Sequence, residues 1–217
     1  MVVVSPPPPD PNRRLRPKFC AVPSGAALVR LFDPTSRYRQ TALSFRYHGP
    51  NRRFDHHRRD AATGKPTDDP ARGIYYGGWS TDQSNGLSSC LVEIFGDTGI
   101  VEFEHWYIAT PVVRRNLRLL DLRGKAAMNA GTVAAVAACD HTLSQPWSRY
   151  FYETPATYPD IDGILYPNAH NHEIALALYE GTRDDLVCPP DRIIPLDHPD
   201  LRPTILHIML ANSLVAR

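Results

Sequence analysis

The sequence lacks paired cysteines, long apolar runs and an excess of charge of either sign. Its four cysteines are widely scattered with no CxxC, which excludes a disulfide framework and predicts reduced thiols in the core. No stretch approaches the roughly 20 apolar residues of a membrane span, and the start MVVVSPPPPDP has no basic segment ahead of a hydrophobic one. The net charge is only +1, so a nucleic acid is not expected to be the main partner. We predict a soluble, cytoplasmic protein that binds neither a membrane nor, directly, a nucleic acid.

Three common ligand-binding signatures are also missing. There is no GxGxxG after a strand, no GxxxxGK[ST] and no HExxH, which excludes Rossmann-type dinucleotide binding, a P-loop and a zincin helix. Two histidine groups remain, His56-His57 and His170-Asn171-His172. Alternate histidines on a strand face the same way and could both bind zinc. Because no further ligand stands at a partner spacing, no metal is predicted, and a metal-dependent hydrolase using His170 and His172 is only a weaker alternative.

The chain has the length of one domain preceded by a short arm. Its 217 residues are 42% hydrophobic, enough for a core of its own. Residues 1–18 are rich in proline, with Pro6–Pro9 in a row, and such a segment neither continues a helix nor pairs in a sheet. We therefore predict a disordered, proline-rich arm over residues 1–18 and one folded domain over residues 19–217.

Strands and helices are expected to mix without regular alternation. Leu87, Leu91, Ile94 and Phe95 recur at helical spacing, with capping residues at 80–83 and Gly96 as a stop. Residues 37–72 are polar, arginine-rich and without clean periodicity, which is typical of a segment that is largely loop and leaves room for one strand. This pattern predicts an α+β fold. Strands or extended segments are expected over 26–32, 73–77, 99–113, 116–122, 162–166 and 174–179, and further helices over 126–139, 147–152 and 200–217.

Several short stretches, taken in order, are similar to those of a known family. Together they resemble the RES domain family, the toxin half of Xre–RES toxin–antitoxin pairs, over about residues 26–179. The resemblance is carried by Leu28-Val29-Arg30, Arg53-Phe54-Asp55, Ile74-Tyr75-Tyr76-Gly77, Cys90-Leu91-Val92-Glu93, Leu119-Leu120-Asp121-Leu122, Ser144-Gln145 and Asp162-Gly163-Ile164-Leu165-Tyr166-Pro167.

The resemblance implies a fold, a reaction and a partner. The fold is a single compact ADP-ribosyltransferase-like domain with a mixed, mostly antiparallel central sheet flanked by helices. The reaction is cleavage of the nicotinamide–ribose bond of NAD⁺ by phosphorolysis, with phosphate as co-substrate, or by hydrolysis. The expected partner is an Xre-type helix-turn-helix antitoxin, and a homodimer is left open. No cofactor or metal is implied, since NAD⁺ is the substrate.

Three residues are candidates for the chemistry itself. Breaking the nicotinamide–ribose bond creates oxocarbenium character on the sugar, which a nearby carboxylate stabilises. Glu93 stands in a mainly apolar helical stretch, where a carboxylate is costly without a dedicated task. Arg30 lies within an apolar run, and its planar guanidinium suits a diphosphate. Because Tyr75 and Tyr76 must point to opposite faces of a strand, only one can stack on nicotinamide, and the family pattern favours Tyr75.

Four further residues are candidates for substrate binding: Arg53, Ser144, Gln145 and Asn168. Asn168 departs from the family pattern, because many members have serine after the Tyr-Pro pair, and an amide cannot act as a hydroxyl. The polar segments on either side of Tyr75 are also longer than in compact members, and they are expected to form a lid, an antitoxin surface or a specificity loop. A protein ADP-ribosyltransferase and a non-catalytic NAD- or ADP-ribose-binding module stay open as alternatives.

Overall fold

One eight-stranded sheet organises the molecule. The computed structural model describes residues 3–217, and within them β9 and β10 form the one parallel pair of this sheet. This confirms an α+β fold with a mixed, mostly antiparallel central sheet. In spatial order the strands are β1 (Phe19–Val22), β9 (Leu117–Asp121), β10 (Gly163–Pro167), β11 (Ile174–Tyr179), β5 (Ile74–Trp79), β2 (Leu28–Phe32), β7 (Tyr107–Ala109) and β13 (Ile193–Pro195).

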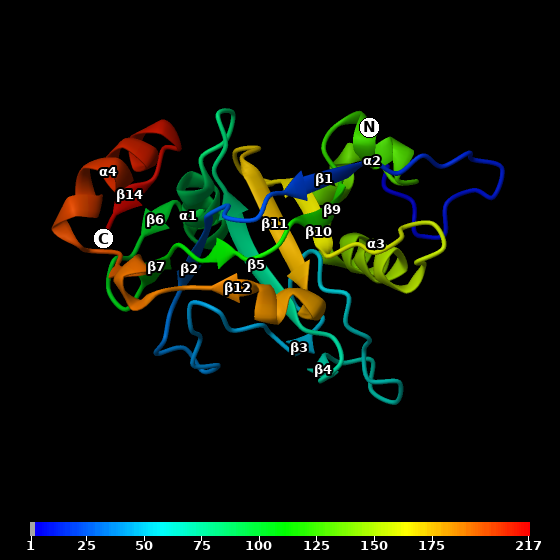
Figure 1. Ribbon diagram of the computed structural model, residues 1–217, viewed down its shortest axis with the longest axis horizontal. Helices are drawn as coiled ribbons and strands as arrows, with labels where there is room; N and C mark the ends of the chain where they lie inside the picture. The colour runs from blue at the N-terminus through cyan, green and yellow to red at the C-terminus, as the bar shows by residue number, and fades with distance from the viewer. Residues whose placement is uncertain (1–2) are drawn as a thin grey trace.

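Helices gather at the two ends of the sheet (Figure 1). Helices α1 (Gly86–Phe95) and α4 (Arg202–Ala211) lie at one end, and α2 (Lys125–Asn129) and α3 (His141–Glu153) at the other. The remaining elements are short: the strand pairs β3 (His48–Gly49) with β4 (Thr67–Asp68), β6 (Ile100–Val101) with β14 (Val215–Ala216), and β8 (Val112–Val113) with β12 (Leu186–Val187), and the 3₁₀ helices η1 (Ala134–Ala137), η2 (Glu180–Asp185), η3 (Pro190–Arg192) and η4 (Pro199–Leu201).

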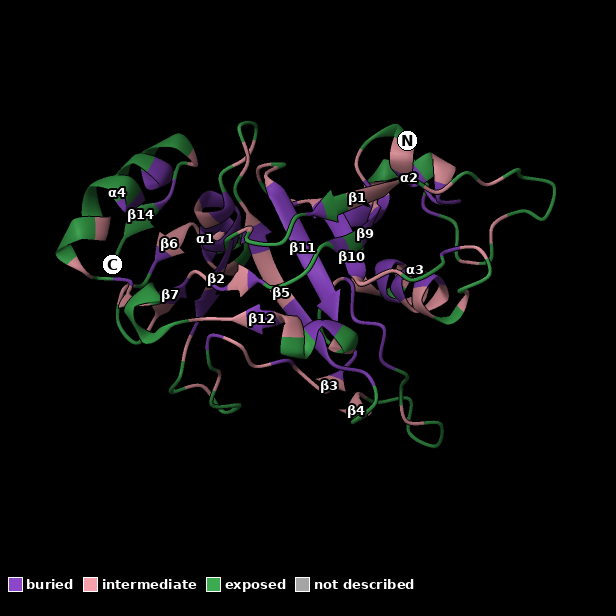
Figure 2. Ribbon diagram, in the orientation of Figure 1, coloured by how far each residue is buried: buried purple, intermediate pink, exposed green. Residues whose placement is uncertain are grey.

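The apolar core lies on both faces of the central strands, which are the most completely buried part of the chain (Figure 2). One cluster holds Trp147 and Phe151 of α3 against β10 and β11. A second joins Leu91 and Phe95 of α1 to Ile208 of α4. The opposite ends of the sheet are thus fixed by separate packing layers, and the middle strands run between them.

Most of the predicted elements are present, with different boundaries. Helix α1 begins after Asn85, whose side chain accepts hydrogen bonds from the N–H groups of Leu87 and Ser88, so the expected caps at 80–83 are wrong. The alanine-rich stretch 126–139 is not one helix, because it breaks at Gly131, where φ is +98°. Helix α3 starts before Pro146, not after it, with Asp140 as its N-cap. The final helix ends at Ala211, and β14 follows it.

The proline-rich arm differs from the expected disordered tail. Residues 3–18 contain no helix or strand, but they lie against α2 and α3. Val4 is buried in the cluster around α3, and the indole of Trp147 donates a hydrogen bond to the Ser5 carbonyl at 2.7 Å. Arg13 donates to the carbonyl of Gly131 at 2.5 Å. Proline prevents regular structure here, but it leaves the carbonyls and apolar side chains free to make tertiary contacts.

The sheet opens between β2 and β5. These strands pair only at Leu28 with Trp79 and at Val29 with Gly78. Beyond that point β2 continues along β7, whereas β5 meets an isolated bridge at Arg46. Helix α1 approaches closely, because a Cβ on Gly78 would overlap the backbone of Gly86. The divergence leaves a space between the two strands and beside α1.

Candidate functional site

A cavity of about 590 Å³ occupies the space where β2 and β5 separate. Its volume falls within the roughly 300–1,000 Å³ of small-molecule sites. Arg30 from β2, Tyr76 from β5 and Glu93 from α1 all line it. Residues 63 positions apart in the sequence therefore meet at one cavity, as the sequence analysis required of Arg30 and Glu93. The segment between β2 and β5 completes the wall with loop residues and with His48 of β3 and Asp68 of β4; the loop residues include Arg37, Tyr38, Arg46, Tyr47 and Arg52.

Arg30 is held from behind by an aromatic ring. Its guanidinium carbon lies 4.5 Å from the ring centroid of Tyr75, a distance typical of cation–π contact. One of its terminal nitrogens, Nη1, is buried and has no hydrogen-bond partner in residues 3–217. A buried guanidinium nitrogen without a partner is costly, because the charged group has lost water without gaining a hydrogen bond.

Glu93 presents its carboxylate to the cavity. It is the exposed residue of an otherwise largely buried helix, so the apolar surroundings read from the sequence lie on the other faces of α1. The residue as a whole is accessible from the cavity, but the surrounding protein keeps much of the water away from its carboxyl; this desolvation raises the pKa of Glu93, and the positive charge of Arg53 opposes that rise. The amide Nδ2 of Asn168 donates a hydrogen bond to Glu93 Oε2 at 3.0 Å.

Tyr76, not Tyr75, faces the cavity. The two rings point to opposite sides of β5, as strand geometry demands. Tyr75 is fully buried among apolar side chains on the far side, and its hydroxyl donates to the Ala42 carbonyl at 3.3 Å. The choice of Tyr75 as the residue that lines the pocket is therefore corrected to Tyr76. Tyr75 instead supports Arg30.

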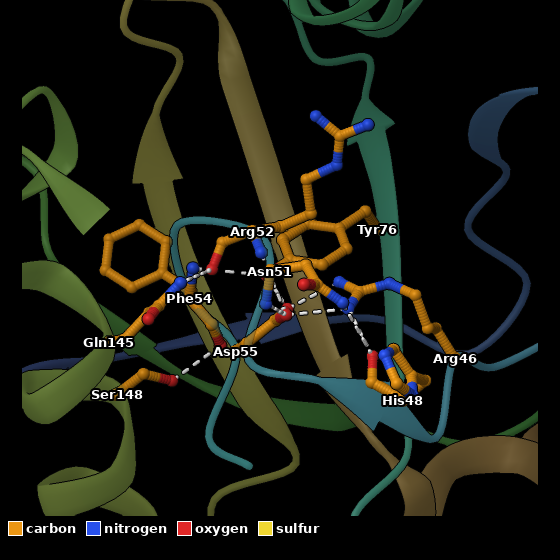
Figure 3. A network of polar contacts seen from close by, with 9 residues as sticks. All are labelled: Arg46, His48, Asn51, Arg52, Phe54, Asp55, Tyr76, Gln145 and Ser148. Carbon is orange, nitrogen blue, oxygen red and sulfur yellow. Dashed lines mark hydrogen bonds and ion pairs between the residues drawn. The ribbon is translucent and has the colours of Figure 1, made fainter. Parts of the chain in front are cut away.

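A buried carboxylate organises the loop at the cavity floor (Figure 3). Asp55 is fully buried and accepts hydrogen bonds from both terminal nitrogens of Arg46, at 2.6 and 2.7 Å. It also accepts from the N–H of Asn51 at 2.5 Å, from the N–H of Arg52 at 2.9 Å and from the hydroxyl of Tyr76 at 2.8 Å. Burial alone would raise the pKa of Asp55, but Arg46 and these N–H groups outweigh it and lower that pKa. Asp55 thus stays charged and orients Tyr76.

The four residues expected to bind substrate do not line this cavity. Arg53 donates to the Cys139 carbonyl, and its charge acts on Glu93. Ser144 is fully buried, and its hydroxyl bonds to the Asp140 carbonyl at 3.4 Å within α3. Gln145 donates to the Arg52 carbonyl at 3.1 Å, which ties α3 to the cavity loop. Asn168 is fully buried behind Glu93. Of the four, Gln145 and Asn168 hydrogen-bond residues that line the cavity, whereas the hydrogen bonds of Arg53 and Ser144 go to residues outside it.

A smaller apolar recess adjoins the main cavity beside Glu93. It measures about 50 Å³ and shares Leu31, Tyr76, Glu93 and Ile94 with the larger space. Tyr166 and Cys90 close its inner end. Burial raises the pKa of the Cys90 thiol to about 12, so this cysteine lines the recess as a neutral, unreactive side chain.

The histidine pairs do not form a metal centre. His170 and His172 lie exposed in the turn between β10 and β11 and not on a strand, so the geometry proposed for zinc is wrong. His56 and His57 are both buried. Within residues 3–217 no group of three or more histidine, cysteine or acidic side chains is arranged to hold a metal ion. Among the same residues, none of the helices combines the length and apolar character needed to cross a bilayer.

Sequence reasoning missed Arg46, Asp55 and Tyr76 as parts of the site. Asp55 had one usable signal, since it directly follows Phe54 and precedes two histidines in a segment assigned to an exposed loop. Arg46 had none, because its pairing with Asp55 depends on how the loop folds back. For Tyr76, strand alternation shows only that it and Tyr75 point to opposite faces, and the sequence does not indicate which face meets the cavity.

Comparison with known proteins identifies no family. No family model and no curated protein sequence matches the chain. Among solved structures, the chain is similar to one from the crystal structure of the M. tuberculosis MbcT–MbcA toxin–antitoxin complex. The TM-score is 0.41 with 13% sequence identity, and the match covers 80% of this chain and 82% of that one. A similarity of this size does not identify a ligand or a reaction.

Proposed function

We propose that the cavity binds NAD⁺ and that the protein cleaves its nicotinamide–ribose bond. One observation carries the proposal: Arg30, with a buried nitrogen that lacks a partner, and the exposed carboxylate of Glu93 line the same cavity. An arginine and a glutamate in one cavity suit NAD⁺, because its diphosphate is negatively charged and its ribose becomes positively charged when the bond to nicotinamide breaks. The resemblance to the RES domain family supports the same assignment.

In the proposed reaction Glu93 acts on the ribose. When the bond from C1′ to the nicotinamide nitrogen breaks, the electron pair leaves with nicotinamide and positive charge develops on the sugar. A carboxylate fixed before the reaction stabilises this charge more than it stabilises the ground state, which raises the rate. Water, phosphate or a protein nucleophile then bonds to C1′ and releases a proton.

The other cavity residues would bind the two ends of the dinucleotide. The guanidinium of Arg30 would make charge-assisted hydrogen bonds to the diphosphate. Nicotinamide would enter the apolar recess next to Glu93 and stack on the ring of Tyr76. Asp55 holds the hydroxyl of Tyr76, so the ring is oriented before a ligand arrives.

The test is release of nicotinamide from NAD⁺ by the purified protein, followed by chromatography. Glu93→Gln should lose at least about 100-fold in kcat, the scale for removing one transition-state electrostatic contact. Glu104→Gln is the matched control, because Glu104 is highly exposed and its ion pair is with its neighbour His105. No release by the wild-type protein, with or without phosphate, would refute the proposal.

The same assay separates the open alternatives. Release that needs phosphate indicates an NAD⁺ phosphorylase, and release in its absence indicates an NAD⁺ glycohydrolase. Transfer of label to a polypeptide indicates a protein ADP-ribosyltransferase. Binding of NAD⁺ or ADP-ribose without turnover would make the protein a binding module.

We also propose that the protein acts as a toxin restrained by a helix-turn-helix antitoxin of the Xre type. This part rests on the resemblance to the RES domain family alone. It predicts that expression of the wild-type chain slows growth and that Glu93→Gln relieves the effect. Normal growth with active wild-type enzyme present would contradict it.

A further inference from the structure

The turn between β10 and β11 forms hydrogen bonds with helix α1 and its N-cap at several positions. Near the start of the helix, Glu173 accepts a hydrogen bond from the N–H of Asn85 at 2.7 Å. One turn later Asn171 donates to the hydroxyl of Ser88 at 3.0 Å. Further along, Asn168 donates to the carbonyl of Ser89 at 3.1 Å. These contacts set both the rotation and the height of α1 relative to the sheet.

Asn168 is the member of this turn that reaches the carboxylate of Glu93. Its side chain is fully buried, and its Oδ1 accepts the N–H of His170 at 2.8 Å. That contact fixes which end of the amide is oxygen, so Nδ2 must face α1. Nδ2 then donates one hydrogen to the Ser89 carbonyl and the other to Glu93 Oε2 at 3.0 Å. All hydrogens of the amide nitrogen are used.

We propose that Asn168 is a positioning residue, which holds the carboxylate of Glu93 in one orientation and favours its charged form. The proposal rests on the function given above, and it goes further by assigning a role to an amide that does not line the main cavity. A hydrogen bond donated to a carboxylate stabilises the ionised state, and a fixed orientation reduces the reorganisation needed in the transition state.

Several other groups surround Glu93 and contribute to its titration. The loop before β5 supplies positive charge, the turn after β10 supplies a histidine, and the end of α1 supplies an acid. In order, these groups are Arg52 and Arg53, His170, and Asp97, with the neutral side chains of Cys90 and Tyr166 on the inner side. None of these named groups hydrogen-bonds the Glu93 carboxylate, whereas Asn168 does.

The decisive experiment compares Asn168→Asp and Asn168→Ala with Asn171→Ala. Asn171 belongs to the same turn and bonds to Ser88 of α1 and to Asn212 after α4, so its loss breaks contacts between the turn and the helices without touching the Glu93 carboxylate. Two quantities are measured: the pH dependence of kcat for nicotinamide release, and the pH titration of the Glu93 side-chain carboxyl by ¹³C NMR. The Glu93 signal is assigned by its absence in Glu93→Gln.

Asn168→Asp keeps the shape of the side chain and places a second carboxyl beside the first. We expect the Glu93 midpoint and the acidic limb of the kcat profile to move up by at least about 1 pH unit, because a like charge disfavours ionisation. Asn168→Ala should shift both in the same direction and lower kcat by roughly 10- to 100-fold, with less effect on KM. Asn171→Ala should leave the midpoint unchanged.

An unchanged Glu93 midpoint in both Asn168 variants, or an equal shift in Asn171→Ala, would overturn the positioning role. The NMR titration needs no turnover, so it tests Asn168 even if the protein releases no nicotinamide. A wild-type protein without activity but with a shifted midpoint in Asn168→Asp would refute the proposed function and leave the contact with Glu93 established.

Discussion

Asp55 and Arg46 form a two-pronged ion pair beneath the cavity, with Oδ1 and Oδ2 each taking one guanidinium nitrogen at 2.6 and 2.7 Å. The carboxylate is fully buried, while Arg46 also donates to the carbonyl of His48 at 2.7 Å. Arg46 forms a β-bridge with Ile74 of β5, so the pair connects this edge of β5 to the loop that contains Asp55. Tyr76 joins it through its hydroxyl.

Loss of the charge on Asp55 should destabilise the whole fold. In Asp55→Asn the guanidinium of Arg46 stays half-buried without its counter-ion, and breaking a buried pair in this way costs about 3–5 kcal/mol. Urea unfolding measures the change in the free energy of unfolding. Asp184→Asn serves as the control, because its ion pair with Arg183 is exposed and should be worth under about 1 kcal/mol. Equal stabilities of the two variants would contradict the role given to Asp55.

The two adjacent tyrosines of β5 should respond differently to substitution. Tyr76→Ala removes a cavity wall and should raise KM for NAD⁺ by about tenfold, consistent with the roughly 1.4 kcal/mol of one aromatic contact. Tyr75→Phe loses only the long bond to the Ala42 carbonyl and keeps the ring behind Arg30, so KM should stay within about twofold. Steady-state kinetics measure both values, and an unchanged KM in Tyr76→Ala would contradict the assignment of Tyr76 as the ligand-facing residue.

The elements that sequence could predict are those set by local pattern. The helical spacing of Leu91 and Phe95 fixed the face of α1 that is buried, and this leaves Glu93 on the open side. The apolar run around Arg30 predicted strand β2. The resemblance to the RES domain family placed Arg30 and Glu93 in the same expected active site. Their meeting at one cavity follows from the close approach of α1 to β5 at Gly78 and Gly86.

The residues that sequence could not assign depend on tertiary contacts. The polarity of 37–72 indicates a segment that is largely loop, and the structure adds only the short strands β3 and β4; nothing in the sequence indicates that Asp55 turns inward to meet Arg46. The resemblance to the RES domain family, many members of which have serine at this point, predicts a ligand contact for Asn168, but in the structure its Nδ2 donates a hydrogen bond to Glu93. The choice between Tyr75 and Tyr76 requires knowing which side of β5 faces α1, and alternation alone does not give that.

His57 should make stability depend on pH. It is buried with no partner for either ring nitrogen in residues 3–217, and this burial lowers its pKa to about 4. The unfolded chain takes up a proton near pH 6.5, whereas the folded protein does not until about pH 4. The stability from His57 is therefore complete above about pH 6.5 and is lost as pH falls toward 4.

Chemical unfolding at pH 7.5 and pH 4.5 measures this effect. We expect a loss of roughly 2–3 kcal/mol between these values in the wild-type protein, and a clearly smaller loss in His57→Gln. His105→Gln is the control, because that histidine lies on the surface and should leave the pH dependence unchanged. An identical pH dependence in His57→Gln and wild type would show that His57 titrates normally.

The proline-rich arm should contribute to stability in part through the burial of Val4. Val4 is 8% exposed within the cluster around α3, whereas Val3 is 69% exposed. Val4→Ala should lower the free energy of unfolding by about 1.5 kcal/mol, the value of two buried methylene equivalents. Val3→Ala should have no effect. If both substitutions were neutral, the arm would not be anchored in solution.

The central claim, that one cavity holds a dinucleotide by its diphosphate while Glu93 faces the ribose, is tested most directly by calorimetric titration with NAD⁺. Glu93→Gln provides a protein that binds without cleaving, and Arg30→Gln is added to it. We predict that the second substitution raises the Kd at least about tenfold, the loss expected for a charge-assisted hydrogen bond to phosphate. An unchanged Kd in a protein that remains folded would show that Arg30 does not bind the ligand and would contradict the assignment.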